Sequence, residues 1–240
     1  MMRKMVTAAV VTLLCVLGVS HYHPGAVVPG EVSPGEVAPG GVVPGEGGAP
    51  AGEEYLARLD SLPVKGRAPM TGYSREAFGQ AWSDDVEVDG GHNGCDTRND
   101  ILRRDLTGAA IKPGTRGCVV ASGVLQDPYS GRPIDFVRGV DSSRAVQIDH
   151  VVALADAWVK GAQQLDERAR RNLANDPLNL LAVDGGLNNQ KEAGDAATWL
   201  PPNKAFRCEY GRRQVDVKQR YGLWVTPAER DALAGILAQC

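Results

Sequence analysis

Four residues whose side chains carry oxygen or nitrogen donor atoms lie on successive predicted strands and a helix between positions 149 and 188. Asp149 and His150 close one predicted strand, Asn179 opens the next, and Asn188 lies on the helix that follows. Two strands and a helix can bring a carboxylate, an imidazole and an amide oxygen to a common point. Carboxylate and amide oxygens suit Mg²⁺, and an imidazole can take a proton from water because its unperturbed pKa lies near neutrality. This set predicts metal-assisted hydrolysis of a phosphodiester.

The spacing of these residues favours a catalytic role. An isolated Asp-His pair usually makes a helix cap or a surface hydrogen bond, but this pair is followed by two suitably spaced asparagines and by a turn at Gly185-Gly186. Asn189 is an alternative to Asn188 as a metal ligand, and a shift of one residue moves a side chain about 100° round a helix. We expect Asn188 to be the ligand.

The segments around these residues predict an α+β fold that is rich in helix. Short strands are expected at 146–149 and 178–183, with a helix following at about 187–194, so that a ββα core would cover about 146–195. A turn cluster at 127–131, between the apolar runs 118–125 and 133–137, predicts an additional β-hairpin. Helices are also expected at 53–62, at 74–82, from Asp96 or Thr97 to about Leu106, at 155–160, at 165–174, and twice near the C-terminus, the last starting at Thr226 with a capping box.

The N-terminal residues predict export from the cell. Arg3 and Lys4 precede an uncharged, mostly apolar stretch from Met5 to Val19, which is too short to span a bilayer comfortably. Small residues at its end provide a cleavage point near Ser20. We therefore expect a signal peptide at residues 1–20.

A lipid anchor is the alternative reading of this segment. Cys15 would be its acceptor, but Leu14 occupies the position where a small residue is needed. We therefore expect cleavage without lipidation, followed by secretion.

A Pro-Gly pair then recurs every five residues from Pro24 to Gly45. Proline lacks a backbone donor and glycine is costly to order, so this composition predicts a disordered linker over 21–52. Attachment to the cell wall is the alternative role.

The remainder, 53–240, fits one folded domain, and none of it is apolar for long enough to insert into a membrane. We expect a monomer.

The cysteines beyond the predicted signal peptide predict disulfides. They are even in number, lie in an exported chain and form no C-x-x-C pair. Four cysteines allow three connectivities, and the sequence does not decide between them. The shortest loops correspond to Cys95–Cys118 and Cys208–Cys240, which is the pairing we expect.

The net charge of −3 is unevenly distributed, with an excess of basic residues over 96–220, around the proposed catalytic set. A mild basic bias permits phosphate binding without demonstrating it. Arg98 and Lys191 are the candidate substrate contacts; the alternatives are an ion pair with Asp96 for Arg98 and solvent for Lys191. The basic run at 207–220 is either a solvated helix face or a track for a nucleic-acid backbone.

The sequence Ile148-Asp149-His150-Val-Val, with Asn179-Leu-Leu and Asn188-x-x-Lys191 after it, resembles the ββα-metal core of HNH endonucleases. Among these, it is most similar to the GmrSD C-terminal-like HNH domains of secreted actinobacterial proteins. The upstream run 93–102 is also similar to that group, and the resemblance covers about 73–223. Two features depart from the pattern. The segment between His150 and Asn179 is longer than in compact members, and the helix position carries no second histidine.

The resemblance implies a role for each residue of the set. His150 would be the general base, Asp149 and Asn188 the metal ligands, and Asn179 the residue that holds the loop by bonding backbone near the histidine. The implied activity is hydrolysis of DNA with low sequence specificity, using Mg²⁺ or alternatively Mn²⁺, with RNA as a further substrate. The rival functions are a catalytically silent, cell-wall-associated nucleic-acid-binding module and an exported nuclease toxin.

Overall fold

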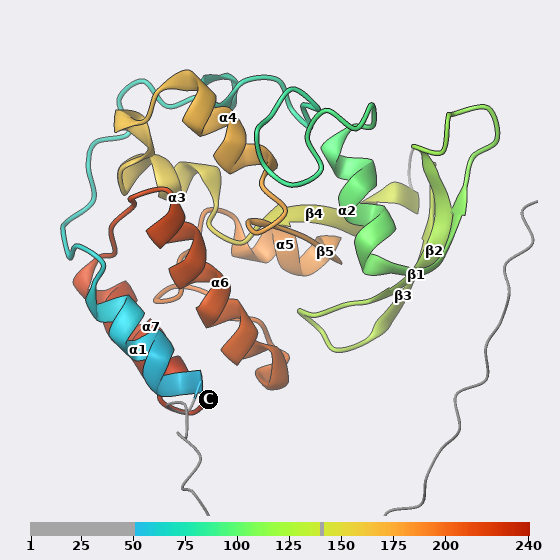
Figure 1. The fold of residues 1–240 in the computed structure, drawn as a ribbon. Coiled ribbons are helices and arrows are strands. Elements are labelled where there is room, and N and C mark those ends of the chain that lie inside the picture. The colour runs from blue at the N-terminus through green and yellow to red at the C-terminus, as the bar shows by residue number, and fades with distance from the viewer. Residues whose placement is uncertain (1–50, 140–141) are drawn as a thin grey trace, which may run out of the picture. The chain divides into compact units, whose positions relative to one another are not determined.

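Two antiparallel strands and a helix form the centre of the fold, in a computed structural model that describes residues 51–139 and 142–240. Strand β4 (Val146–His150) pairs with β5 (Leu180–Asp184), and His150 lies opposite Leu180. Helix α5 (Gly185–Lys191) starts directly after β5 (Figure 1). Both strands are almost completely buried; this is expected for the mostly apolar β5, whereas β4 also buries Asp149 and His150. The predicted ββα core is therefore confirmed.

The turn from β5 into α5 requires a glycine. A Cβ at Gly185 would lie 2.0 Å from the carbonyl oxygen of Arg144, so no larger residue fits. The side chain of Asp184 accepts a hydrogen bond from the amide of Leu187 at 2.8 Å and caps the helix. Helix α5 therefore begins two residues earlier than expected and ends at Lys191 rather than near residue 194, since Glu192 adopts a positive φ of 50°.

A second sheet contains three antiparallel strands in the order β1-β2-β3. They are β1 (Leu106–Ile111), β2 (Val120–Gln126) and β3 (Pro133–Val137). The pairing of β2 with β3 is the predicted hairpin, whereas β1 was not predicted. Strand β1 contains a glycine at positive φ and two alanines, so it lacks the β-branched run that usually indicates a strand.

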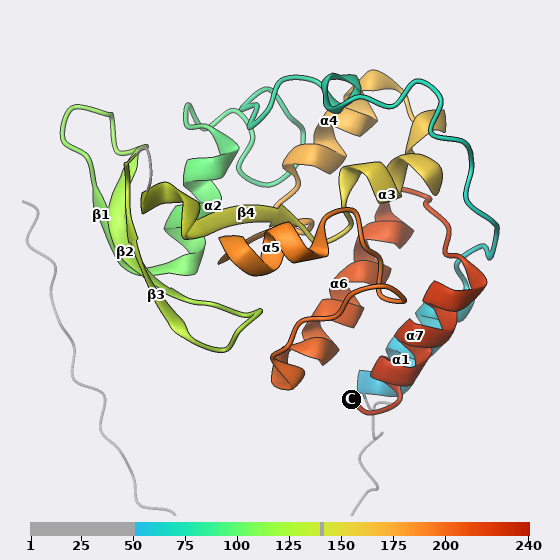
Figure 2. The ribbon, with the colours of Figure 1, turned by 180° about the vertical axis from the view of Figure 1, so that it is seen from behind.

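Helix α2 (Thr97–Asp105) packs between the two sheets, as Figure 2 shows from behind. Asp96 is its cap and accepts from the amide of Asn99 at 3.0 Å, which settles the expected choice between Asp96 and Thr97. The helix and both sheets share one apolar cluster, whose buried members are Ile101, Leu102, Leu106, Val120, Leu125, Phe136, Val146, Ile148, Leu180 and Ala182.

Helices α3 (Leu154–Val159) and α4 (Glu167–Asn175) lie between β4 and β5 in the chain, and α4 corresponds to the helix expected at 165–174 in this long segment. The short 3₁₀ helix η1 (Arg75–Phe78) packs against α4. A longer helix over 74–82 was predicted, and that prediction is wrong. Ser74 caps the turn as expected, but the chain leaves it at Gly79, where φ is 81°.

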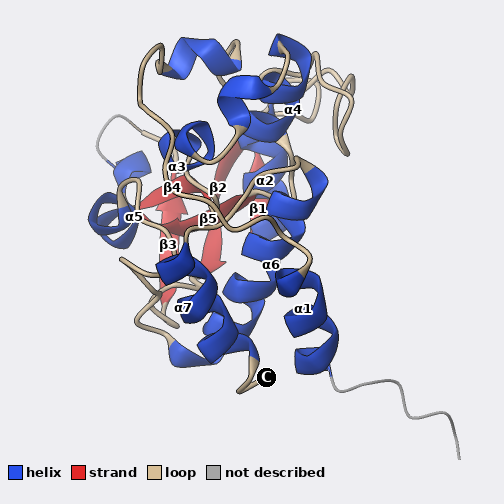
Figure 3. Ribbon diagram, turned by 90° about the vertical axis from the view of Figure 1, so that its left-hand side faces the viewer, coloured by secondary structure: helices blue, strands red, loops and turns tan. Residues whose placement is uncertain are grey.

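Three helices, α1 (Ala51–Asp60), α6 (Arg207–Arg220) and α7 (Pro227–Leu237), pack together and bury Leu59 and Leu233. Helix α7 has the predicted capping box, formed by Thr226 and Glu229. Figure 3 shows the strands enclosed by helices, which confirms a helix-rich α+β fold. The remaining short 3₁₀ helices are η2 (Ser142–Arg144), η3 (Ala162–Gln164) and η4 (Lys204–Phe206).

Two disulfides join the pairs predicted from the shortest loops, Cys95–Cys118 and Cys208–Cys240. The first ties the segment before α2 to the segment before β2, and the second ties α6 to the residues after α7. The described residues belong to one compact unit. No helix in these ranges has both the length and the hydropathy that a membrane span needs. The predicted signal peptide and nearly all of the predicted linker lie outside the described residues.

Candidate active site

His150, the last residue of β4, is buried, with 8% of its surface exposed. Its Nε2 atom lies 2.9 Å from the carbonyl oxygen of Ala174, at the end of α4. A carbonyl can only accept, so Nε2 carries the proton and Nδ1 of the neutral ring keeps its lone pair. Burial lowers the pKa of His150 to about 4, against the opposing effects of the Ala174 bond and of Asp149. At neutral pH the ring is therefore in the form that can accept a proton.

Asp149 is buried and held at both carboxylate oxygens. The hydroxyl of Tyr129 donates to Oδ2 at 2.5 Å, and the Nζ of Lys191 donates to Oδ1 at 3.0 Å. The Lys191 ammonium also donates to the backbone oxygen of His150 at 2.8 Å. Burial and the nearby Asp149 raise the pKa of Tyr129 well above its usual value, so its hydroxyl remains a donor. These contacts fix the orientation of the Asp149 carboxylate beside His150.

Asn179 is fully buried and bonds only to backbone. Its Oδ1 accepts from the amide of Val152 at 2.8 Å, and its Nδ2 donates to the carbonyls of Val152 and Leu173 at 3.2 and 3.3 Å. Its own carbonyl accepts from the amide of Val151 at 2.8 Å. The side chain thus ties the turn after His150 to helix α4, an arrangement that fits the loop-holding role expected for it.

Asn188 and Asn189 line the same cavity as Asp149 and His150, with a volume of about 600 Å³. The Nδ2 of Asn188 donates to the side chain of Gln147 at 2.9 Å, and its amide oxygen has no hydrogen-bond partner among the described residues. Both asparagines therefore remain candidate ligands. We refer to this space as the polar cavity. Its lining residues are Tyr73, Arg75, Gln147, Ile148, Asp149, His150, Ala153, Leu154, Ala155, Asn188, Asn189, Glu192 and Ala193.

The donor atoms of the polar cavity suit a hard cation that keeps much of its water. In the described part of the chain, no group of three or more His, Cys, Asp or Glu side chains is arranged to hold a metal. The cavity does offer the carboxylates of Asp149 and Glu192 and the amides of the two asparagines. Mg²⁺ is commonly held by one or two carboxylates and several waters. A carboxylate has about four lone-pair sites, so the two hydrogen bonds to Asp149 leave room for a metal bond.

The two predicted substrate contacts lie elsewhere than expected. The side chain of Lys191 is 0% exposed and bonds to Asp149 and to backbone, so the predicted direct contact with a phosphate is wrong. It serves instead to position Asp149. Arg98 is half-buried on α2 and does not line the polar cavity. Burial and the neighbouring Arg138 lower the pKa of Arg98 despite the attraction of Asp96.

Two residues at the site were not predicted as functional. Arg75, on η1, is exposed and lines the polar cavity together with His150. Trp82 lies with its ring nearly parallel to that of His150, at an interplanar angle of 13° and a centroid separation of 6.1 Å. The capping serine before Arg75 was visible in the sequence, but no local signal places this segment beside β4.

Most cations of the basic run on α6 have partners within the protein. Arg213 bonds to Glu209 and to the carbonyl of Leu178, and Arg220 bonds to Asp176. Lys218 is buried and lies 3.0 Å from an oxygen of Glu229. Arg207 donates to the carbonyl of Pro201, and Arg212 lies over the ring of Tyr55.

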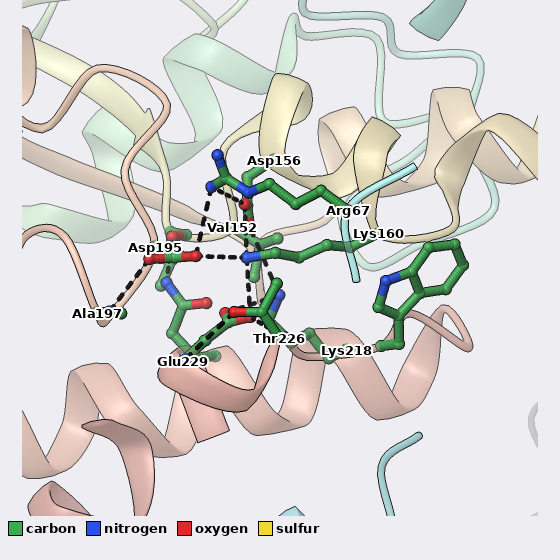
Figure 4. A network of polar contacts seen from close by, with 12 residues as sticks. Arg67, Val152, Asp156, Lys160, Asp195, Ala197, Lys218, Thr226 and Glu229 are labelled. Atoms are coloured by element: carbon green, nitrogen blue, oxygen red, sulfur yellow. Dashed lines mark hydrogen bonds and ion pairs between the residues drawn. The ribbon is translucent and has the colours of Figure 1, made fainter. Parts of the chain in front are cut away.

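A buried ion network joins the segments that flank the site (Figure 4). Its centre is Lys160, which lies 2.6 Å from Asp156, 2.7 Å from Asp195 and 2.8 Å from Glu229. Burial alone would lower the pKa of Lys160, but the carboxylates outweigh it and raise that pKa. The network links α3, the segment after α5, α6 and α7. Its members are Arg67, Asp156, Lys160, Asp195, Lys218 and Glu229, whose formal charges cancel.

Comparison with known proteins identifies the family. Residues 96–236, more than half of the chain, match the family model of the C-terminal domain of GmrSD restriction endonucleases. An uncharacterized secreted protein of Arthroderma benhamiae is 34% identical over 193 residues, which cover 80% of this chain and 87% of that protein. No solved structure matches the chain. The match includes both strands and the helix of the ββα core, and the chain belongs to the family of GmrSD restriction endonuclease C-terminal domains.

Proposed function

We propose that this protein is a metal-dependent endonuclease of the HNH type that hydrolyses DNA with low sequence specificity. The observation that carries the proposal is the environment of His150. Its ring is neutral at physiological pH, its Nε2 is bonded to the Ala174 carbonyl, and it borders a cavity that contains the Asp149 carboxylate. A fixed imidazole with a free Nδ1 is a suitable general base for water.

Each residue of the set has a distinct part in this reaction. His150 takes the proton of the attacking water at Nδ1 while the Ala174 carbonyl holds Nε2–H. Tyr129 and Lys191 keep the Asp149 carboxylate in place, and Asn179 keeps the turn after His150 in place. Holding reacting groups in position removes much of the entropic barrier to reaction.

Asp149 and Asn188 are the residues that would hold Mg²⁺, or alternatively Mn²⁺. When bound, such an ion stabilises negative charge that develops on the phosphate and the leaving oxygen. The polar cavity supports this assignment because its oxygen donors match the preference of a hard cation. RNA is a further substrate to test beside DNA.

We further propose that the protein is exported, as a monomer. Two disulfides fit an oxidising compartment, and the Arthroderma relative is described as secreted. The N-terminal sequence has the charge and apolar stretch of a signal peptide. Retention at the cell wall through the Pro-Gly segment is an additional hypothesis, which fractionation of culture medium and cell walls tests.

The decisive experiment is plasmid nicking by the purified, oxidised protein with Mg²⁺, with Mn²⁺ and with EDTA. We expect metal-dependent nicking that His150→Ala abolishes, with an unchanged circular dichroism spectrum. Full activity in the variant would refute the assignment of the base. Well-folded wild-type protein that binds DNA but never cuts it would point to a nucleic-acid-binding module instead.

A further inference from the structure

A second cavity lies on the other side of His150. It has a volume of about 500 Å³, and Arg75, His150 and Leu154 line both this cavity and the polar cavity. The polar cavity contains the carboxylate and amide oxygens of the proposed reaction site, whereas the second cavity contains Phe78 and Trp82. We call this second space the aromatic cavity. Its remaining lining residues are Glu76, Gly79, Gln80, Ala81, Ala174 and Asn175.

Trp82 is held in a backbone conformation that bulky residues seldom adopt. Its φ is 58°, and its carbonyl accepts a hydrogen bond from the amide of Thr97 at 3.3 Å. The left-handed region is unfavourable for such a residue, so the surrounding structure must enforce it. The result is an indole ring that is partly exposed and nearly parallel to the imidazole of His150.

Asn175 adds a buried polar side chain to the lining of the aromatic cavity. This side chain is 1% exposed, and its Nδ2 donates to the carbonyl of Arg171 at 2.9 Å. Its Oδ1 is buried and has no hydrogen-bond partner among the described residues.

Arg75 places a guanidinium at the junction of the two cavities, next to the carboxylate of Glu76. Its side chain is exposed and makes no hydrogen bond or ion pair with any residue in the described ranges. A guanidinium that borders both cavities suits a phosphate placed between them. An aromatic wall and an exposed guanidinium together match the base and the phosphate of one nucleotide.

We propose that the aromatic cavity binds one unpaired nucleobase of the substrate strand, next to the bond that is cut. This inference rests on the proposed nuclease function and specifies its substrate as single-stranded or locally unpaired nucleic acid. In a duplex both faces of a base are stacked, so a base enters a side cavity only from a single strand or after flipping out. Trp82 stacks on the base, and Arg75 contacts the adjoining phosphate.

The test compares one sequence as a single strand, as a duplex and as a duplex with an unpaired bulge. We expect the single strand and the bulge to be cut at least about 10-fold faster than the duplex. Base–aromatic stacking is strong enough that Trp82→Ala should raise the KM for the single strand by about 10-fold, while Trp82→Phe keeps part of that affinity. Val137→Ala removes an exposed apolar side chain outside both cavities and should change neither KM nor kcat.

A second measurement requires no variant. In a series of single-stranded oligonucleotides, each with one abasic position, cleavage by the wild-type protein should fall only when the missing base adjoins the cut. Equal cutting at every abasic position, or equal rates on single strand and duplex, would overturn the base-binding site while leaving the nuclease intact.

Binding in EDTA separates the two proposals. Trp82-dependent affinity for the single strand, in a protein that cuts nothing with any metal, would support the base site and refute the nuclease. Affinity that is the same for Trp82→Ala and the wild-type protein would refute the base site whatever the cleavage result.

Discussion

The ammonium of Lys191 lies 3.0 Å from the carboxylate of Asp149, and both groups are buried beside the proposed catalytic base. Lys191 is on α5 and Asp149 is on β4, so the contact joins the helix to the strand of the ββα core. The same ammonium bonds to the carbonyl of His150. One side chain therefore positions both the proposed ligand and the backbone of the proposed base.

Replacement of Lys191 should destabilise the protein strongly. Lys191→Met leaves Asp149 buried without its counter-charge, a change that typically costs about 3–5 kcal/mol. Urea denaturation monitored by circular dichroism measures the free energy of unfolding. The double variant Asp149→Asn/Lys191→Met should recover much of that loss, because no unpaired charge remains. A double variant no more stable than Lys191→Met would show that the ion pair is not the cause.

Stability should depend on pH through His150. The pKa of this group is 6.5 when unperturbed and about 4 in the folded protein, so between these values the unfolded chain binds a proton that the folded chain does not. The free energy of unfolding therefore falls as the pH is lowered through this window, by roughly 3 kcal/mol from this group. Urea denaturation from pH 7 to pH 4, with EDTA present, measures it. The free energy of unfolding of His150→Gln should depend less on pH than that of the wild-type protein. An equally steep fall in both proteins would show that His150 does not cause it.

The two asparagines of α5 should differ in their effect on metal use. Asn188→Ala removes a proposed ligand and should raise the Mg²⁺ concentration needed for half-maximal nicking by about 10-fold or more. Asn189→Ala is the matched control, because the residue lines the same cavity and is expected to leave that concentration unchanged. The reverse outcome would assign the ligand to Asn189. Identical Mg²⁺ curves for both variants and the wild-type protein would remove α5 from the metal site.

The ion network around Lys160 should contribute far more to folding than any surface ion pair. Lys160→Met removes the ammonium that pairs with Asp156, Asp195 and Glu229. The free energy of unfolding should fall by about 3–5 kcal/mol, because these buried carboxylates then lack part of their counter-charge. Arg230→Ala is the control, because it breaks the exposed pair with Asp60 and should cost less than about 1 kcal/mol. Thermal unfolding of both variants tests this. Equal melting temperatures would show that the network contributes nothing specific.

Structural elements that are indicated by residues close together in the chain could be predicted from the sequence. Strand β5 is a short apolar run, α5 begins at the predicted turn at Gly185-Gly186, and the β2–β3 hairpin surrounds a recognisable turn cluster. The disulfide pairing followed from loop lengths. These features depend on residues near one another in the chain, so the information is present in a single sequence.

Features that depend on distant packing could not be predicted in this way. Nothing near Lys191 in the sequence indicates that its ammonium is buried against Asp149. Arg75 and Trp82 reach the site because η1 packs on α4, a contact between segments far apart in the chain. Strand β1 was missed for a different reason, since its glycine and alanines have little intrinsic preference for a strand.

The paired cations of α6 have a consequence for behaviour in salt. Each phosphate that a free basic side chain neutralises releases counterions, which lowers affinity as ionic strength rises, with a slope of about −0.7 per contact for single strands. Lys218, Arg213 and Arg220 are already paired with Glu229, Glu209 and Asp176. These three side chains should therefore add little to that slope. A rise in salt concentration should weaken binding to nucleic acid mainly through basic residues outside α6.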